Sequence, residues 1–310
     1  MEEKIEIMNL LQSKQVLEHE LQSLAYGSVE IRENNSNKYI YVHYKEDGVA
    51  LTKYVGEYSD ELYNLVLNNS IKAKQLKKQI REITKKLKQL NYTEEELSEK
   101  VEQNIDFAKR HLVDTIYKQA ILEGVATTFA DTESIIEGGK VNNMTSEDIL
   151  KIVNLKHAWE FILNKNVILS DTNFALLCEI NKMVEEGFYY TAGKVRNTPV
   201  TIGGTTWKPD LPIESVIKEE LEEIFSKELD DIDRAIELLL YTMKKQVFID
   251  GNKRTAVIYS NHYLISKGKG IIAIPAELTE EFKDLLIPYY EGRDEKEIKK
   301  FIKEKCYMSI

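Results

Sequence analysis

The spacing of hydrophobic residues changes character within the first sixty positions. Leucines recur at helical intervals over residues 10–24, and Gly27 ends that pattern. Apolar and polar residues then alternate with a period of two over residues 28–56, in three runs that polar segments separate. The second separator contains Asp47-Gly48, a strong hairpin signal. The pattern predicts an initial helix followed by a three-stranded antiparallel meander.

A long basic helix is predicted next, over about residues 58–90. Its apolar residues step by four, three, four and three, as in a heptad seam: Leu76, Ile80, Ile83, Leu87 and Leu90. Lysines and one arginine flank this seam, and Glu82 is the acid that opposes them. We favour a solvated face of a helix packed on its neighbour. Contact with a partner protein, self-association and nucleic-acid binding stay open, the last less favoured because few aromatic residues interleave with the lysines.

A domain boundary is expected between residues 92 and 110, where Thr93-Glu94-Glu95-Glu96 has the form of a capping box. From about residue 110 the pattern is helical, with one interruption over residues 187–212 that is rich in glycine and proline. We therefore expect a mainly α protein. An N-terminal α+β part with the meander and basic helix covers residues 1–100, and a helical domain covers residues 110–310.

Composition narrows the class of protein. The 310 residues carry 42 basic and 52 acidic side chains, a net charge of −10, which argues against a surface that binds nucleic acid or anionic lipid throughout. No apolar run approaches the 18 or more residues of a membrane span, and the acidic amino terminus is not typical of a signal peptide. The two cysteines have no metal-site spacing. We expect a cytoplasmic protein without a membrane partner.

The candidate chemistry lies in residues 246–255, QVFIDGNKRT, between two apolar-rich helical patterns. Gly251 permits a sharp turn, and the unpaired N–H groups at the start of the next helix suit an anion. Lys253 and Arg254 add two cations there, and Asp250 is placed to bind Mg²⁺ beside a phosphate. The plain alternative is a helix corner whose polar residues cap the helix or face solvent.

The full string resembles the signature of the Fic/Doc (Fido) family, which reads His, any residue, Phe, any residue, Asp or Glu, then Gly-Asn-Gly/Lys-Arg. Two further segments resemble family features in the same order. Residues 192–212 are similar to its flap, predicted here as a short β-hairpin at Gly203-Gly204, and Ile136-Glu137-Gly138 is similar to its inhibitory helix. The resemblance covers roughly residues 110–310. It implies a helical domain that binds ATP and most often transfers AMP to a hydroxyl of a protein target.

The resemblance also implies roles for residues of this chain. Gly251, Asn252 and Lys253 would form the anion hole, Arg254 would hold the phosphates, and Asp250 would bind Mg²⁺. Glu137 would be the regulatory glutamate. The flap would hold a target segment with a Ser, Thr or Tyr hydroxyl as an added strand. Its central residues are Thr201, Ile202, Gly203, Gly204 and Thr205.

Three departures from the family pattern bear on activity. Gln246 stands at the place of the catalytic histidine, and a carboxamide cannot take a proton near neutral pH. Val257 stands where many members have a second arginine. The lack of that arginine makes this chain similar to the Doc branch, and this resemblance implies transfer of phosphate. Glu133 replaces the Ser or Thr of the inhibitory segment. Three functions therefore stay open: a protein adenylyltransferase, a nucleotide-binding module without chemistry, and a Doc-like phosphotransferase toxin.

Overall fold

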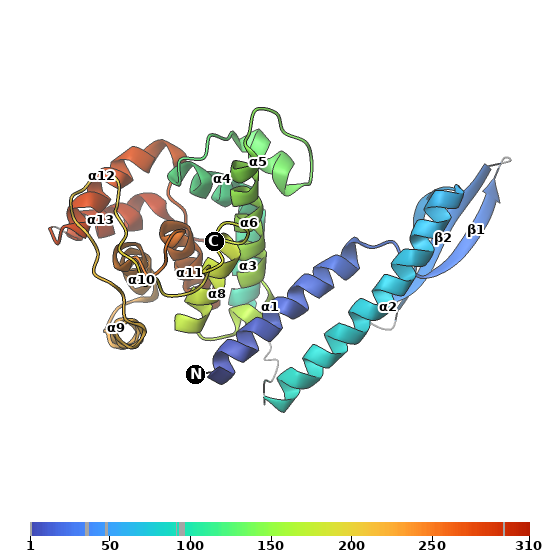
Figure 1. Cartoon of the computed structure of the whole chain (residues 1–310), viewed down its shortest axis with the longest axis horizontal. Coiled ribbons are helices and arrows are strands. Elements are labelled where there is room, and N and C mark those ends of the chain that lie inside the picture. The colour runs from blue at the N-terminus through green and yellow to red at the C-terminus, as the bar shows by residue number, and fades with distance from the viewer. Residues whose placement is uncertain (1, 35–36, 47–48, 91, 93–96, 294) are drawn as a thin grey trace. The chain divides into compact units, whose positions relative to one another are not determined.

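The computed structural model describes residues 2–34, 37–46, 49–90, 92, 97–293 and 295–310. Contacts divide the chain into two compact units, Met1–Thr93 and Glu94–Ile310, which Figure 1 shows in blue to cyan and in green to red. The predicted turn at Asp47-Gly48 and the predicted capping box at 93–96 lie outside the described residues. Each unit is described by itself.

The first unit is an α+β unit, which confirms the predicted meander and basic helix. Its elements, in order, are α1 (Glu2–Ser23), β1 (Ser28–Asn34), β2 (Asn37–Glu46), β3 (Val49–Glu57) and α2 (Asp60–Gln89). The strands pair antiparallel in the order β1-β2-β3, with β3 at one edge. Helix α1 packs on α2. The basic helix therefore has an intramolecular neighbour for part of its surface.

One face of the meander forms the core of this unit against α2. Ile40 and Val42 of β2 and Val66 of α2 are fully buried and pack together. Lys53 of β3 lies directly opposite Val42 in the register. Because opposed residues of antiparallel strands share a face, Lys53 stands on the same face of the sheet as this core. Helix α2 begins at an N-cap, Ser59, whose side chain accepts the Leu62 N–H at 3.1 Å.

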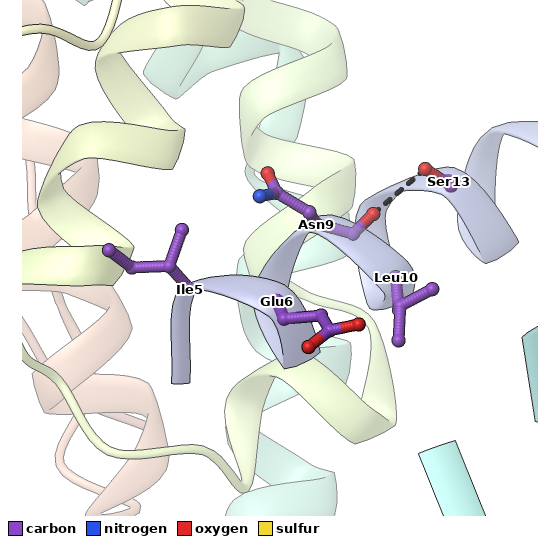
Figure 2. A pocket seen from close by; sticks show the side chains of 5 residues that line it. All are labelled: Ile5, Glu6, Asn9, Leu10 and Ser13. Carbon is purple, nitrogen blue, oxygen red and sulfur yellow. Dashed lines mark hydrogen bonds between the residues drawn. The ribbon is translucent and has the colours of Figure 1, made fainter. Parts of the chain in front are cut away.

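A shallow pocket lies along one face of α1 (Figure 2). Ile5, Asn9 and Ser13 recur every four residues along it, and Glu6 and Leu10 complete its lining. The Ser13 hydroxyl donates to the Asn9 carbonyl at 2.8 Å, a bond that stays within the helix. All the lining residues belong to one face of α1, and none of them is among the candidate site residues.

The second unit is helical, as the sequence predicts. Its helices are α3 (Glu99–Arg110), α4 (Leu112–Leu122), α5 (Phe129–Ile136), α6 (Ser146–Ile162), α7 (Lys165–Ile168), α8 (Phe174–Val184), α9 (Glu214–Ser226), α10 (Asp231–Lys245), α11 (Asn252–Ser266), α12 (Thr279–Tyr290) and α13 (Lys296–Phe301). A short antiparallel pair, β4 (Ile271–Ile272) and β5 (Tyr307–Met308), closes it. Helix α3 is tied to this unit by Asn104, whose side-chain oxygen accepts the Gly270 N–H at 2.5 Å. The unit thus starts ahead of residue 110.

Helix α11 runs through the middle of this unit, against α3, α6, α8 and α10. Nearly all its side chains are buried, including polar ones, so each polar group needs a partner inside. Asn261 exchanges two 2.8 Å hydrogen bonds with the backbone of Ile272. His262 bonds the Thr172 hydroxyl and the Val167 carbonyl, and burial lowers the pKa of His262 to about 4. These bonds fix α11, and with it the position of its N-terminus.

Across the described part of the chain, the helices are too short or too polar for any of them to cross a bilayer.

Candidate functional site

The turn between α10 and α11 is built from two residues in left-handed conformation. Gln246 ends α10 with φ 49° and ψ 59°, and Gly251 precedes α11 with φ 73°. Glycine suits position 251 because of this φ, and a Cβ there would also meet the Glu185 side chain in its present rotamer. The first N–H groups of α11 have no acceptor within the helix, so the turn presents donors and the positive end of the helix dipole.

Arg254 lies in the first turn of α11 and is almost fully buried, at 3% exposure. Its Nη2 atom is 2.7 Å from the Glu185 carboxylate and 3.8 Å from Asp250, and its Nε atom is 3.9 Å from Glu123. Its Nε and Nη1 atoms have no hydrogen-bond partner among the described residues. A buried guanidinium with unused donors is equipped to bind an oxyanion.

Glu185 is the carboxylate nearest to this arginine. It caps the C-terminus of α8 and is 2% exposed, and its carboxylate lies against Gly251 and Arg254. Burial raises the pKa of Glu185 to about 7, an effect that outweighs the attraction of Arg254. The Glu185 carboxylate therefore already occupies the place where the turn would bind an anion. With a pKa of about 7, this carboxylate is partly protonated at neutral pH.

Buried asparagines hold the turn to its surroundings. Asn181 of α8 donates to the Asp250 carbonyl at 3.0 Å and accepts from the Gly193 N–H at 2.9 Å. Asn252 accepts from the Phe248 N–H at 3.0 Å and donates to the Phe248 carbonyl at 2.9 Å. The Asn252 side chain is thus used within the turn, and what it can offer a ligand is its backbone N–H. Phe248 is 1% exposed and anchors the turn in the core.

The Gln246 carboxamide is bonded at both ends. Its nitrogen donates to the Met243 carbonyl at 2.6 Å, and its oxygen accepts from Asn252 at 3.2 Å. The first bond satisfies a carbonyl that the end of α10 leaves without a helical partner. In this structure Gln246 completes the C-terminus of one helix and supports the start of the next.

Arg196 joins the turn to the flap. It is 3% exposed, and its Nε donates to the Gln246 carbonyl at 2.6 Å. Its two terminal nitrogens donate to the carbonyls of Thr198 and Asp210 at 2.8 and 2.7 Å. One guanidinium therefore bonds Thr198 at the start of the flap, Asp210 shortly after it, and the left-handed Gln246 of the motif.

The flap, residues 198–206, is an extended loop with a turn at Gly203-Gly204 rather than the short strand ladder that the sequence predicts. Proline at 199 and at 209 supplies no N–H on either arm, which disfavours a ladder between the arms. The loop rests on the end of α12. The Thr205 hydroxyl donates to Glu291 at 2.7 Å, and the Trp207 ring stacks on Tyr290 with centroids 5.8 Å apart. Thr201 is exposed, and Ile202 is partly exposed.

Asp250 is the residue of the site best suited to a metal. Half of its side chain is exposed, and one oxygen accepts the Gly251 N–H at 2.7 Å, which leaves the other oxygen free for a cation. The described residues contain no group of three or more His, Cys, Asp or Glu that could hold a metal ion. One carboxylate suits Mg²⁺ when phosphate oxygens and water supply the other ligands, so the residues present fit a magnesium–nucleotide complex.

The two remaining predicted residues are placed differently. Lys253 is partly exposed, and its Nζ atom lies 3.6 Å from Glu123. Glu137 is the C-terminal cap of α5, is exposed, and is not among the described carboxylates that contact Arg254. The acids that reach Arg254 are Glu123, Glu185 and Asp250, so the regulatory role predicted for Glu137 has no support from a contact at the site.

Sequence reasoning missed Asn181, Glu185 and Glu123. A signal for the first two was present, because they stand four residues apart at the end of a largely apolar helix, on one face. Glu123 lies just beyond the end of α4, and nothing in its local pattern distinguishes it from a solvated residue. Arg196 was seen as part of the flap segment, without its bonding role.

The arrangement defines a class of protein: a helical domain in which a buried helix starts at a left-handed glycine turn, beside an extended loop. Residues 171–264 match the Fic/DOC family. The matched range is less than half of the chain, so this match and the shared fold support a Fic-type domain in the second unit. No curated protein matches the chain.

Three solved structures share the fold. A Fic domain containing signaling protein from Bacteroides thetaiotaomicron VPI-5482 is 19% identical, over 61% of this chain and 75% of that one, with a TM-score of 0.51. Fic-1 of C. elegans is 16% identical, over 78% and 79%, with a TM-score of 0.52. A Fic family protein from Desulfovibrio desulfuricans G20 is 12% identical, over 67% and 72%, with a TM-score of 0.53. At these identities the likeness concerns the fold alone.

Proposed function

We propose that the turn at Asp250–Arg254 binds the phosphates of ATP and that the second unit transfers AMP from ATP to a hydroxyl of a protein target, with release of pyrophosphate. The observation that carries this proposal is the buried Arg254 with two unused donor nitrogens, one turn beyond a left-handed glycine that opens a helix. Backbone N–H groups, a helix dipole and a guanidinium then act on one anion. The family match supports the same class of reaction.

Phosphate binding in this proposal requires Glu185 to give up its contact with Arg254. A phosphate and an ionised carboxylate cannot share the same donors without strong repulsion, since both are negative and the surroundings exclude water. Protonation removes that repulsion, and rotation of the side chain frees the space above Gly251. Glu185 therefore competes with the nucleotide in the resting protein.

Each remaining residue has a role in the bound state. Asp250 holds Mg²⁺, which neutralises phosphate charge, and Lys253 adds a cation at the edge of the turn. The flap pairs with an extended target segment, and its free N–H and C=O groups at residues 201–205 bind that backbone. Gln246 orients the attacking hydroxyl by hydrogen bonding but cannot accept its proton, which passes to a phosphate oxygen or to water.

The absence of a titratable group at Gln246 predicts a slow reaction. Loss of a positioned base costs about 10²–10⁴-fold in rate, while electrostatic stabilisation by the turn is retained. The experiment that tests this is incubation of the protein with Mg²⁺ and ATP labelled at the α-phosphate, in a cell extract, followed by detection of labelled protein. Labelling that falls in Asp250→Ala and rises in Gln246→His supports the proposal. Labelling that appears only in Gln246→His contradicts it for the natural protein.

A second candidate is a nucleotide-binding module without turnover. The observation that favours it is the bonding of Gln246 at both ends of its carboxamide, which gives this residue a complete structural role. Such a module would be stabilised by ATP, by about 2.7 kcal/mol at 100 times its Kd, and would label no target. Turnover that depends on Asp250 would exclude it.

A Doc-like phosphotransferase is a third candidate. It is distinguished from the two candidates above by whether the α- or the γ-phosphate of ATP carries the label that reaches the target. Val257, at the place of the family's second arginine, is 2% exposed and packs in the core, so the site presents one motif arginine. If label follows the γ-phosphate of ATP rather than the α-phosphate, phosphate is the group transferred. Label that follows the α-phosphate identifies AMP.

A further inference from the structure

The first unit contains a pocket of about 540 Å³ that none of the roles above uses. Its apolar lining comes from three parts of the unit: Leu21 of α1, Leu24 just after it, Val42 and Tyr44 of β2, and Ile80 of α2. The Tyr26 ring adds to this wall, 5.7 Å from the ring of Tyr44. We refer to it as the N-terminal pocket. Its volume is in the range of sites for small organic ligands.

Three cations line the same pocket from two elements. Lys53 belongs to β3, and Lys77 and Arg81 belong to α2. The register places Lys53 opposite the fully buried Val42, on the face of the sheet that turns toward the helix. The Lys77 ammonium lies 4.7 Å from the centre of the Tyr26 ring. Arg81 and Lys77 stand four residues apart and so share one face of α2.

These cations lack acidic partners. Among the described residues, no carboxylate lies within ion-pair distance of Lys53, Lys77 or Arg81. The one acid of the lining, Glu18, lies 3.7 Å from Lys14. Three cations and one carboxylate therefore line a half-apolar hollow, a net charge of about two positive units. Such a site attracts anions, and its apolar wall gives binding energy to a ligand that is not purely ionic.

The plain alternative is that each cation serves solubility. A lysine that points inward from an edge strand discourages pairing with another sheet, and β3 is an edge strand. That reason applies to Lys53 and not to the two cations on the helix. It also does not account for a hollow of this size between them.

We propose that the N-terminal pocket binds a small amphiphilic anion, with a linear or flat apolar body and a single carboxylate or phosphate end. The apolar body lies against Leu24, Val42 and Ile80, and the anionic end meets Lys53, Lys77 and Arg81. A neutral analogue has no negative group to bind the cations, and an inorganic anion has no apolar part to bind the apolar wall. Both should therefore bind more weakly than an amphiphilic anion. An acidic peptide and an oligonucleotide are larger than this hollow.

The test uses the full chain and the displacement of anilinonaphthalene sulfonate, an aromatic anion that fluoresces in apolar sites. Decanoate, decyl phosphate and decanol compete with this probe below the concentration at which they form micelles. We expect decanoate or decyl phosphate to displace the probe at least tenfold more effectively than decanol. The stronger of the two anions identifies carboxylate or phosphate as the preferred end.

The test variant is a double variant that carries both Lys53→Glu and Arg81→Glu. The control is the single variant Lys86→Glu. Lys86 is exposed and lies nine residues, or about two and a half turns, beyond Lys77, on the other side of α2. We expect the double variant to weaken decanoate at least tenfold and the control to change it by less than twofold. If circular dichroism shows that the double variant is unfolded, Lys53→Met replaces it, with the same direction of change.

Several results would overturn the proposal. Equal displacement by decanol and decanoate would show an apolar surface without selection for charge. No displacement, or unchanged affinity in the double variant, would show that the three cations do not form a site. Displacement by an acidic peptide or an oligonucleotide, but by neither small anion, would assign the cations to a macromolecule.

Discussion

Two regions of this chain gather positive charge in opposite ways. At the turn before α11, the buried Arg254 is met by Glu185 at 2.7 Å, with Glu123 and Asp250 just beyond 3.5 Å. In the N-terminal pocket, Lys53, Lys77 and Arg81 have no such neighbours among the described residues. A buried charge must be paired, whereas exposed charges are solvated by water. An anion that enters the first region displaces a carboxylate of the protein, and one that enters the second displaces water.

The largest expected effect of this difference is on stability at Arg254. Arg254→Ala leaves the buried Glu185 without its cation, which should lower the free energy of unfolding by about 3–5 kcal/mol. The measurement is urea denaturation above pH 7, where Glu185 is ionised, followed by the fluorescence of Trp159 and Trp207, which both lie in this unit. Adding Glu185→Gln should restore part of the loss. If the double variant is no more stable than Arg254→Ala alone, the pair is not coupled.

The next effect concerns nucleotide binding. Glu185→Gln removes the internal competitor of a phosphate, so we expect ATP to bind about tenfold more tightly, about 1.4 kcal/mol. Calorimetry with Mg²⁺-ATP measures this change. Glu186→Gln is the matched control, because Glu186 is the exposed neighbour. Equal affinities for the wild type and Glu185→Gln would show that Glu185 does not limit access to the turn.

Comparison of the wild type with Glu185→Gln also tests how stability and ATP affinity depend on pH. The groups that act on Glu185 are Arg254, Asp250, Glu123 and Lys151, and burial raises the pKa of Glu185 from 4.5 to about 7. A raised pKa stabilises the folded state at low pH, and this contribution is lost as the pH rises through 7. Glu185→Gln should therefore gain stability relative to the wild type as the pH rises. Over the same range its advantage in ATP affinity should grow, and a constant ratio would contradict the assignment.

A smaller effect on stability is expected from helix capping, and it should differ between the two units. Ser59→Ala removes the side-chain cap of α2 and should destabilise the first unit by about 1 kcal/mol. Ser98→Ala is its control, because Ser98 precedes α3 without a side-chain cap hydrogen bond. Hydrogen exchange reads the two units separately. A larger loss of protection in Ser98→Ala than in Ser59→Ala would contradict the caps that the structure shows.

The smallest effect is expected at the unpaired cations. Arg81→Ala should change the free energy of unfolding by no more than about 0.5 kcal/mol, since Arg81 is exposed and has no acidic neighbour among the described residues. Thermal denaturation of the full chain measures it. A loss as large as that of Arg254→Ala would mean that the N-terminal pocket already holds an anionic group of this chain.

Much of the fold was predictable because it depends on local patterns. The change from period two to helical period at residue 57 sets the end of β3 and the start of α2, and the structure confirms both. The turn at Gly251 was also readable, because a glycine between two helical patterns predicts a turn that ends one helix and starts the next. Whether these residues bind a nucleotide stays a prediction.

The contacts that control the turn were not readable in the same way. Glu185 and Arg196 stand about 66 and 55 residues before Gly251, and the local sequence of each does not tell which residues it contacts. Burial gives them their properties: at 2% exposure Glu185 has a raised pKa, and at 3% exposure Arg196 bonds three carbonyls. Neither effect exists in an extended chain.

The sequence by itself determined the helices, the meander, the left-handed glycine and the cations that follow it, because these depend on neighbours within a few residues. Only the tertiary structure decided which acid faces Arg254. Three carboxylates reach that arginine from α8, from the end of α4 and from the turn itself, while Glu137 does not. Packing of distant helices sets the distance and the exclusion of water, and these two quantities fix how strongly charges interact.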